Sequence, residues 1–251
     1  MIALDTATAA TVHGAIEIAA MALGAALYRS ARRKSQLSAV TAPGAFALMV
    51  GLLLGAAIGN KLIFAIERPD LMLAWWQGTA PLRLGQSIIG GLLGGLIGIE
   101  TAKAITRQPA STGDLMVLPL CIGIALGRVG CFIAGLNDDT YGLPTTLPWG
   151  VDMGDGIARH PTALYEIAFL AVLCILLTRQ RARLAPVPGL AFKCFLASYL
   201  LWRFLIDLVK PVRYPYPLGL SGIQWVCLLA LLAYLPLLLR AAAHLKERER
   251  S

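Results

Sequence analysis

The sequence predicts an all-α membrane protein that crosses the bilayer with seven helices, its amino terminus outside and its carboxyl terminus in the cytoplasm. The first observation is composition: of 251 residues, 57% are hydrophobic and 14% are charged, which is typical of integral membrane proteins. The second is a series of apolar runs of roughly the ~20 residues that a helix needs to cross hydrocarbon. The third is the distribution of basic residues between these runs, which follows the positive-inside rule.

The seven apolar runs follow one another along residues 1–251 as a single transmembrane domain. They are Val12–Tyr28, Gly44–Ile66, Ser87–Ile105, Leu115–Ala134, Pro161–Thr178, Gly189–Val209 and Ile223–Leu239. The first run lacks the basic start of a cleavable signal peptide and is followed by four cations within six residues, Arg29 to Lys34. It is therefore expected to remain as a signal anchor.

Basic residues then set the orientation. With the amino terminus outside, the inside segments hold Arg29, Arg32, Arg33, Lys34, Arg107, Arg179, Arg181, Arg183, Arg240, Lys246, Arg248 and Arg250. The outside segments hold fewer: Arg68, Arg83, Arg159, Lys210 and Arg213. The net charge of +8 is thus a topology signal, and a nucleic-acid partner is not expected. The predicted location is the bacterial inner membrane.

Cysteine placement bears on cofactors. All five cysteines lie inside apolar runs, and no paired spacing indicates a disulfide framework or a zinc site: Cys121, Cys131, Cys174, Cys194 and Cys227. Except for Cys131, which is a candidate site residue, they are expected to be small packing residues. No cofactor or metal is predicted from the spacing.

The fourth run contains the most informative stretch, Gly127 to Gly142. It places Arg128 inside an apolar helix and ends in a polar cluster that Tyr141 and Gly142 close. A guanidinium in hydrocarbon costs about 2.5–3.5 kcal/mol on insertion scales, so such a residue normally has a partner or a function. The outside loop 136–160 that follows is expected to carry part of the site.

Ionisable residues on several helices fall at about the same predicted depth, in the outer half of the bilayer. They are His13, Glu17, Lys61, Arg128, His160, Tyr165, Glu166, Tyr199, Arg203 and Asp207. Unrelated structural ion pairs would have no reason to share a depth. The sequence therefore predicts one polar site near the outer leaflet.

Deeper in the bilayer, the third run has two notable patterns. Gly90, Gly94 and Gly98 repeat at the four-residue spacing that lets helix backbones approach closely. Glu100 and Lys103 lie one turn apart, and two interpretations stay open. They form an ion pair at the inner interface, or Glu100 faces the site from below.

Three cations at one depth need anions. Lys61, Arg128 and Arg203 would repel one another unless carboxylates or a lipid phosphate lie between them, and arginine matches phosphate oxygens well. The sequence thus favours an anionic phospholipid site, with a purely structural ion-pair network as the alternative.

Proton transfer has two candidate groups. His160 precedes the fifth run at the water boundary, where the pKa range of histidine suits acid–base work. Asp138 and Asp139 are adjacent on a glycine-bounded loop and can act as a base or bind a cation through oxygen. A solvated acidic turn is the alternative for this pair.

Four segments in this order resemble the prolipoprotein diacylglyceryl transferase family. They are GRVGCF at Gly127–Phe132, RHPTALYE at Arg159–Glu166, YLLWRFLIDLVKP at Tyr199–Pro211 and GLSGIQW at Gly219–Trp225. Each segment is weak by itself, but the ordered set is specific and covers nearly the whole chain.

The resemblance implies transfer of diacylglyceryl from phosphatidylglycerol to a cysteine thiol of a lipoprotein precursor, with release of glycerol phosphate. It also implies that Arg128 and Arg203 are essential arginines facing the phosphate. Asp207 would stand for the family's glutamate one turn after the second arginine, and His13 falls near its first-helix histidine.

Several positions depart from the family pattern. Cys131 stands where the family has asparagine after Arg-x-Gly, Ala134 replaces the next asparagine, and Leu136 replaces the signature glutamate. Ile89 replaces the histidine of the family's His-Gly-Gly, the residue often assigned as the base. The phosphate-binding part is thus kept, and the part that activates the thiol is rewritten.

The combined prediction is a membrane transferase acting on an anionic phospholipid at the outer leaflet. The predicted catalytic residues are Arg128, Arg203, Asp138, Asp139 and His160. The predicted substrate-binding residues are Lys61, Cys131, Tyr141, Tyr165, Glu166, Tyr199, Asp207 and Glu100. The alternatives are a non-enzymatic phospholipid-binding or transport protein on the same scaffold, a lipid transferase with a different acceptor, and a covalent role for Cys131.

Overall fold

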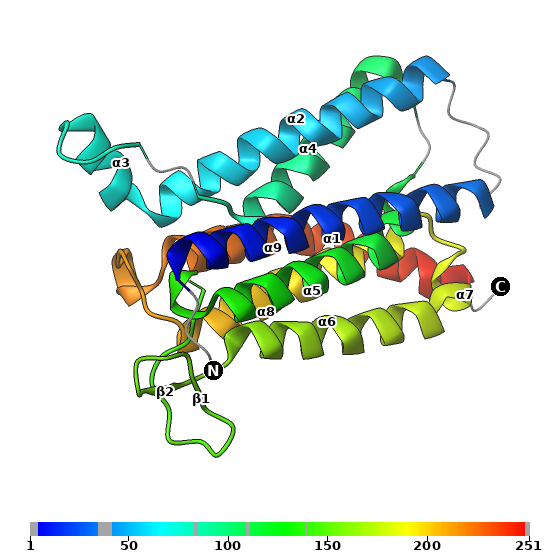
Figure 1. The fold of residues 1–251 in the computed structure, drawn as a ribbon. Helices are drawn as coiled ribbons and strands as arrows, with labels where there is room; N and C mark the ends of the chain where they lie inside the picture. The colour runs from blue at the N-terminus through cyan, green and yellow to red at the C-terminus, as the bar shows by residue number, and fades with distance from the viewer. Residues whose placement is uncertain (1–4, 35–41, 83–84, 109–110, 139, 249–251) are drawn as a thin grey trace. The chain divides into compact units, whose positions relative to one another are not determined.

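The computed structural model describes residues 5–34, 42–82, 85–108, 111–138 and 140–248, so Arg83, Asp139 and Arg250 lie outside the described residues. Regular structure in these residues is almost entirely helical (Figure 1). The α-helices are α1 (Thr6–Lys34), α2 (Ala42–Glu67), α3 (Pro69–Trp76), α4 (Ile88–Thr106), α5 (Val117–Ala134), α6 (Thr162–Arg179), α7 (Arg181–Leu184), α8 (Leu190–Ile206) and α9 (Gly222–Arg248). The 3-10 turns are η1 (Gly113–Met116), η2 (Gly135–Asn137), η3 (Asp207–Val209) and η4 (Pro217–Gly219), and the strands are β1 (Val151–Asp152) and β2 (Ala158–Arg159).

All seven predicted apolar runs are helical. Within the described residues, six helices are long and apolar enough to cross a membrane: Thr6–Lys34, Gly44–Glu67, Ile88–Thr106, Gly113–Asn137, Thr162–Arg179 and Gly222–Arg248. The run predicted at Gly189–Val209 forms α8, which has 17 residues and continues directly into η3. The chain is thus an all-helical, multi-pass membrane protein, whereas the orientation of its termini stays a prediction.

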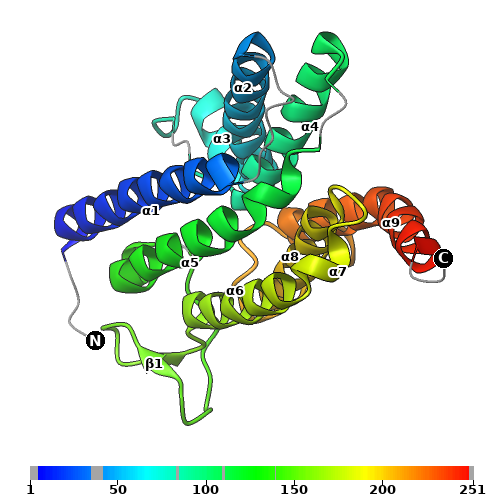
Figure 2. The ribbon, with the colours of Figure 1, turned by 90° about the vertical axis from the view of Figure 1, so that its right-hand side faces the viewer.

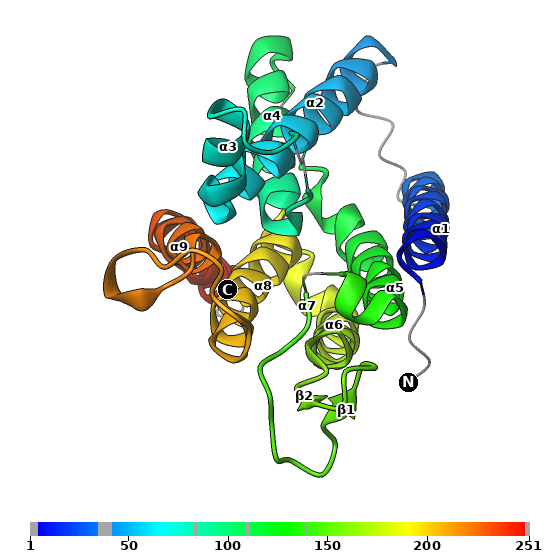
Figure 3. The same ribbon diagram turned by 60° about the vertical axis from the view of Figure 1, so that its left-hand side comes forward.

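The described chain divides into two compact units, and α9 contributes to both. The first contains α1, η1, α5, η2, the β1–β2 hairpin, α6, α7, α8, η3 and the part of α9 from Tyr234 onward. Within it, α1 packs along α5, and α5 packs along α6 (Figures 1 and 2). Figure 3 views α1, α5 and α6 close to their axes, with the hairpin below the end of α6.

The second unit contains α2, α3, α4, η4 and the start of α9. Its main contact is between α2 and α4, which pack through glycines on both helices. A Cβ atom on Gly55 would overlap the carbonyl oxygen of Gly94, and one on Gly94 would overlap the carbonyl oxygen of Gly55. The glycine repeat predicted to permit close backbone approach is thus confirmed, and α2 supplies the matching glycines.

A capping box starts α9 in the second unit. Gln224 Oε1 accepts a hydrogen bond from the Ser221 backbone N–H at 2.9 Å, and Ser221 Oγ accepts one from the Gln224 N–H at 3.1 Å. Each side chain satisfies an amide that the first helical turn leaves without a partner. The Ser221 and Gln224 side chains of the Gly219–Trp225 segment therefore have a structural role at the start of α9.

Candidate functional site

The end of α5 sets the position of the site in the first unit. Helix α5 carries Arg128 in its last turns and ends at Gly135, whose φ of +59° is a conformation that favours glycine. The chain then turns through η2 toward Asp138. This reversal brings the polar loop back beside the last turn of the helix that holds Arg128.

A buried ion pair joins α5 to α6, and a hydrogen bond continues it to α8. Arg128 Nε lies 2.9 Å from Glu166 Oε2, and the Tyr199 hydroxyl donates to Glu166 Oε1 at 2.5 Å. Arg128, Glu166 and Tyr199 are 5%, 1% and 0% exposed. Charge and hydroxyl groups this far from water need such partners. The polar residues predicted on three different runs therefore meet in one place.

Helix α8 carries a second ion pair one turn beyond Tyr199. Arg203 Nη2 lies 3.2 Å from Asp207 Oδ1 in η3, and both residues are buried. The charge of Arg203 acts on Glu166 as well, after that of Arg128. The two ion pairs thus belong to one electrostatic cluster, which we call the arginine cluster: Arg128, Glu166, Tyr199, Arg203 and Asp207.

Lys210 is a further charged residue beside this cluster. Its place in the sequence predicted only a cation of an outside loop. It is 8% exposed although it follows η3 outside the helices. Burial and the charges of Arg203 and Arg128 lower the pKa of Lys210 to about 7. Its three-residue spacing from Asp207 was the sequence signal that could have identified it.

The net charge of the arginine cluster taken together with Lys210 depends on the protonation of Lys210. The two arginines and two carboxylates of the cluster cancel, so the cluster with Lys210 is neutral when Lys210 is neutral and carries one positive charge when Lys210 is protonated. A phosphodiester carries one negative charge. The protonated cluster therefore matches a single phosphodiester.

A second polar group lies on the opposite side of Arg128. Its Nη1 donates to Cys131 Sγ at 3.6 Å, and the same sulfur lies 3.7 Å from His13 Nε2. Glu17 Oε1 is 3.5 Å from this ring nitrogen. Asp138 completes the group, since one atom each of His13, Cys131 and Asp138 lies within 4.8 Å of the others.

Backbone packing positions His13 in this group. A Cβ on Gly130 would lie 2.8 Å from His13 Cδ2, so the absence of a side chain at Gly130 makes room for the ring. Thr6 Oγ1 at the start of α1 donates to Asn137 Oδ1 at 3.2 Å. Helix α1 is therefore joined to the turn that carries Asp138.

The loop between η2 and α6 holds a third group. Trp149 Nε1 donates to the Tyr165 hydroxyl at 2.7 Å, and His160 Nδ1 lies 3.2 Å from the same oxygen. The loop is joined to helices by the Leu143 N–H, which donates to the Val209 carbonyl at 2.8 Å, and by Thr162 Oγ1, which donates to the Thr140 carbonyl at 2.6 Å. Loop 140–161 is thus attached to the ends of both α6 and α8.

The remaining loop contacts involve Arg159. Its guanidinium pairs with Asp155 and lies 5.3 Å from the centre of the Tyr141 ring. Hydrogen bonding to Arg159 lowers the pKa of Asp155. Tyr141 therefore contacts a cation of the hairpin, whereas its predicted role in substrate binding stays a prediction.

Two predicted site residues lie in the second unit. Lys61 Nζ donates to the Gly85 carbonyl at 2.9 Å. Glu100 Oε1 lies 2.7 Å from Lys103 Nζ, so the ion pair that the sequence offered as one interpretation is present. The assignment of Lys61 and Glu100 to substrate binding stays a prediction.

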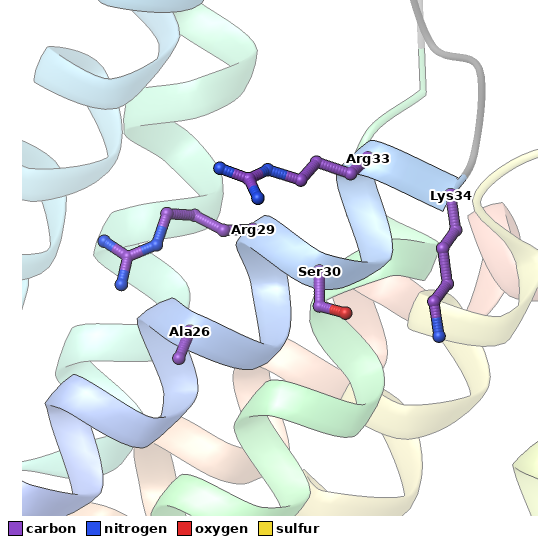
Figure 4. A pocket seen from close by; sticks show the side chains of 5 residues that line it. All are labelled: Ala26, Arg29, Ser30, Arg33 and Lys34. Carbon is purple, nitrogen blue, oxygen red and sulfur yellow. The ribbon is translucent and has the colours of Figure 1, made fainter.

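The other end of α1 is basic. Arg29, Arg33 and Lys34 line a hollow with Ala26 and Ser30 on the last turns of this helix. Figure 4 shows the guanidinium groups of Arg29 and Arg33 extending to the same side. This end lies more than three helical turns from His13 along α1, which agrees with a topology signal separate from the site.

Most of the chain is similar to known proteins of one family. The family model described as prolipoprotein diacylglyceryl transferase matches residues 2–240. A phosphatidylglycerol–prolipoprotein diacylglyceryl transferase of Geobacter sulfurreducens is 31% identical over 172 residues, which cover 66% of this chain and 63% of the relative. One of the same name from Polynucleobacter asymbioticus is 32% identical over 196 residues, covering 72% of this chain and 70% of the relative. The chain thus spans 63% and 70% of the lengths of these two curated relatives.

Proposed function

Because the chain belongs to the prolipoprotein diacylglyceryl transferase family, we propose that it transfers a diacylglyceryl group from phosphatidylglycerol to the cysteine thiol of a lipoprotein precursor. The other product is glycerol phosphate. The relatives' names specify this donor and this class of acceptor. The retained arginines and the altered acceptor side of this chain make the donor half the better supported part of the proposal.

The proposed setting is the outer leaflet of the bacterial inner membrane. Helix α8 with η3 would be the seventh span, with the amino terminus outside and the carboxyl terminus in the cytoplasm. The basic end of α1 supports this orientation because cytoplasmic loops carry the excess of arginine and lysine. The arginine cluster would then lie near the outer ends of α5, α6 and α8.

The observation that carries the function is the buried arginine cluster. Two ion pairs and a tyrosine hydroxyl are gathered from three helices and η3, and each charged member is at most 8% exposed. Replacing a buried ion pair by apolar residues is often neutral or stabilising, so such a cluster is weak evidence for a stabilising role. A phosphate that binds two guanidinium groups supplies the functional reason to keep it.

In the proposed reaction, the thiol sulfur attacks the glyceryl carbon next to the donor phosphate. A carbon–sulfur bond forms, and the carbon–oxygen bond to the phosphate breaks. The electron pair leaves with the phosphate oxygen, so negative charge grows there as the reaction proceeds. Arg128 and Arg203 are placed to stabilise that charge through hydrogen bonds that a planar guanidinium makes well.

The acceptor side has three candidate groups. Asp138, Asp139 and His160 remain proposed for activation of the thiol. Asp138 lies beside Cys131 next to Arg128. His160 lies beside Tyr165 and Trp149 in the loop. The position of Asp138 favours it over His160, because Arg128 connects it to the arginine cluster.

The test is a reconstituted transfer reaction. The full chain in phosphatidylglycerol vesicles is mixed with a peptide that carries one cysteine, and the thioether product and glycerol phosphate are measured by mass spectrometry. Arg203→Ala is expected to lower turnover at least ~100-fold, in the range for loss of one transition-state hydrogen-bond donor. Arg179→Ala at the exposed end of α6 is the control and should retain activity. Full activity of Arg203→Ala would contradict the phosphate role, and bound lipid without turnover would favour a lipid-binding protein.

A further inference from the structure

The group formed by His13, Cys131 and Asp138 has the composition of a transition-metal site. Among the described residues, it combines a ring nitrogen, a thiol sulfur and a carboxylate oxygen that all lie within 4.8 Å of one another. Zinc is bound in proteins by these three ligand types, and catalytic zinc sites use three protein ligands with one open position. We propose that His13, Cys131 and Asp138 bind a zinc-type divalent ion, whose open position takes the thiol of the acceptor.

The distances already approach those of a loaded site. With Zn–S of ~2.3 Å and Zn–N of ~2.0 Å, sulfur and nitrogen in a tetrahedral site lie about 3.5 Å apart. Cys131 Sγ and His13 Nε2 are 3.7 Å apart. A carboxylate oxygen of Asp138, within 4.8 Å of both, needs to move by roughly 1 Å to complete the geometry.

The surroundings support the ligands. Thr140 Oγ1 donates to Asp138 Oδ2 at 3.0 Å, which orients the carboxylate. The missing Cβ of Gly130 leaves space for the His13 ring. Hydrogen bonds from residues that do not themselves bind the metal commonly orient metal ligands in this way. The three ligands are only partly buried, so a substrate can approach the ion.

Charge balance also fits a divalent cation. A thiolate at Cys131 and a carboxylate at Asp138 cancel two positive charges. Arg128, whose Nη1 is 3.6 Å from the sulfur, is neutralised by Glu166 on its other side. With the Glu17 carboxylate 3.5 Å from His13 Nε2 also counted, the loaded group carries one negative charge, whereas the same anionic groups without the ion carry three.

The proposed metal ion would also activate the acceptor thiol, and this part of the inference rests on the proposed function. A metal-bound thiol loses its proton and remains a nucleophile. The proton passes to the carboxylate of Glu17, 3.5 Å from His13 Nε2, and from there to water. The thiolate sulfur then attacks the glyceryl carbon as described above. Arg128 contacts both groups and so places donor phosphate and acceptor sulfur on two sides of one guanidinium.

The sequence pattern offered Asp138 as a possible cation ligand but did not predict this site, because its three ligands have no motif spacing. His13 lies on α1, Cys131 on α5 and Asp138 in the turn after η2. The family pattern has asparagine at the position of Cys131, so the substitution itself supplies the soft ligand. The departures from the family pattern on the acceptor side are thus explained by activation of the acceptor thiol through a metal ion.

Metal content is the first measurement, and it does not depend on activity. The full chain is purified in detergent without a polyhistidine tag, and zinc is quantified by mass spectrometry. We expect about one zinc per chain, the stoichiometry of a single three-ligand site. Cys131→Ser and His13→Gln should bind zinc at least ~10-fold more weakly, the lower limit seen even for residues that only orient ligands. Cys194→Ser on α8 and His244→Gln on α9 are matched controls that should keep the metal.

Cobalt then reports on the open position. In protein loaded with Co²⁺, coordination by Cys131 should give a thiolate-to-metal charge-transfer band. A peptide with one cysteine should strengthen this band, and the same peptide with an S-methylated cysteine should not. Absence of stoichiometric metal, or metal that Cys131→Ser and His13→Gln retain, overturns the site. Bound cobalt that does not respond to the thiol peptide overturns its role with the acceptor.

These outcomes are separate from failure of the proposed function. Metal binding and the cobalt spectrum are measured without phosphatidylglycerol, so they stand whatever the transfer assay gives. Loss of transfer on chelation, restored by zinc, supports the role of the site. Undiminished transfer in metal-free protein overturns that role and leaves the transferase assignment intact.

Discussion

Arg128 shows how one residue can connect two kinds of chemistry. Its Nε pairs with Glu166, and its Nη1 donates to Cys131. Lysine offers a single point charge and cannot make both contacts in fixed directions, because only guanidinium presents donors in a planar fork. We therefore expect Arg128→Lys to keep the fold and to lose most of the proposed turnover.

At the residue scale, the Tyr199 hydroxyl should matter for stability. Tyr199→Phe removes a hydrogen bond to the buried Glu166 carboxylate and is expected to cost about 1.5–3 kcal/mol, the range for hydrogen bonds to charged groups. Thermal unfolding in detergent measures the change. Tyr28→Phe, near the basic end of α1, is the control. Equal unfolding temperatures for Tyr199→Phe and the wild type would show that the bond contributes nothing.

Lys210 gives a prediction about pH. Its pKa of about 7 means that it is charged below that pH and neutral above it. Since a phosphodiester binds better to a cluster with one positive charge, affinity for phosphatidylglycerol should fall as pH rises through about 7. Binding to the lipid in mixed micelles measures this dependence.

Two substitutions test whether Lys210 causes the pH dependence. Lys210→Met should bind weakly at every pH, and Lys210→Arg should keep its affinity when pH rises. A wild-type pH dependence that survives in Lys210→Met would show that Lys210 is not its cause.

At the scale of elements, the α2–α4 contact depends on glycine. Gly55→Leu or Gly94→Leu would place a side chain against the backbone of the facing helix and force the helices apart. Overpacking of a close contact typically costs about 1–3 kcal/mol, so a lower unfolding temperature and a lower yield of folded protein are expected.

Gly91 supplies the matched control on the same helix. A Cβ there meets no atom within 4 Å, so Gly91→Leu should leave unfolding nearly unchanged. The idea that close backbone approach holds α2 to α4 would be wrong if Gly91→Leu were as destabilising as Gly94→Leu.

At the scale of the whole molecule, the orientation in the membrane is the main prediction. In a background with the five native cysteines replaced, Ile157→Cys in the exposed hairpin should react with an impermeant thiol reagent added outside intact cells. Ala182→Cys on α7 should react only after the cells are opened. The reverse pattern would place the arginine cluster near the inner leaflet and contradict the proposed topology.

The amino-acid sequence by itself determined the helices and indicated the buried arginines. Apolar runs of this length have few alternatives in a bilayer, because backbone groups must be satisfied within each segment. Buried arginines are costly enough to be recognised without a structure, so Arg128 and Arg203 could be singled out from their place in apolar runs. The predicted runs and the observed helices therefore agree within a few residues, except that α1 and α9 extend further.

Only the tertiary structure decided which residues share a group. Lys210 looked like a loop cation until packing buried it, and Cys131 was predicted as a substrate-binding residue with no indication that α1 brings His13 within 3.7 Å of it. Both depend on interactions between residues more than 80 positions apart, as with Arg128 and Lys210 or His13 and Cys131. Hydropathy and local spacing describe one segment at a time, so they place a residue along its helix. The partners that it meets are determined by how the helices pack.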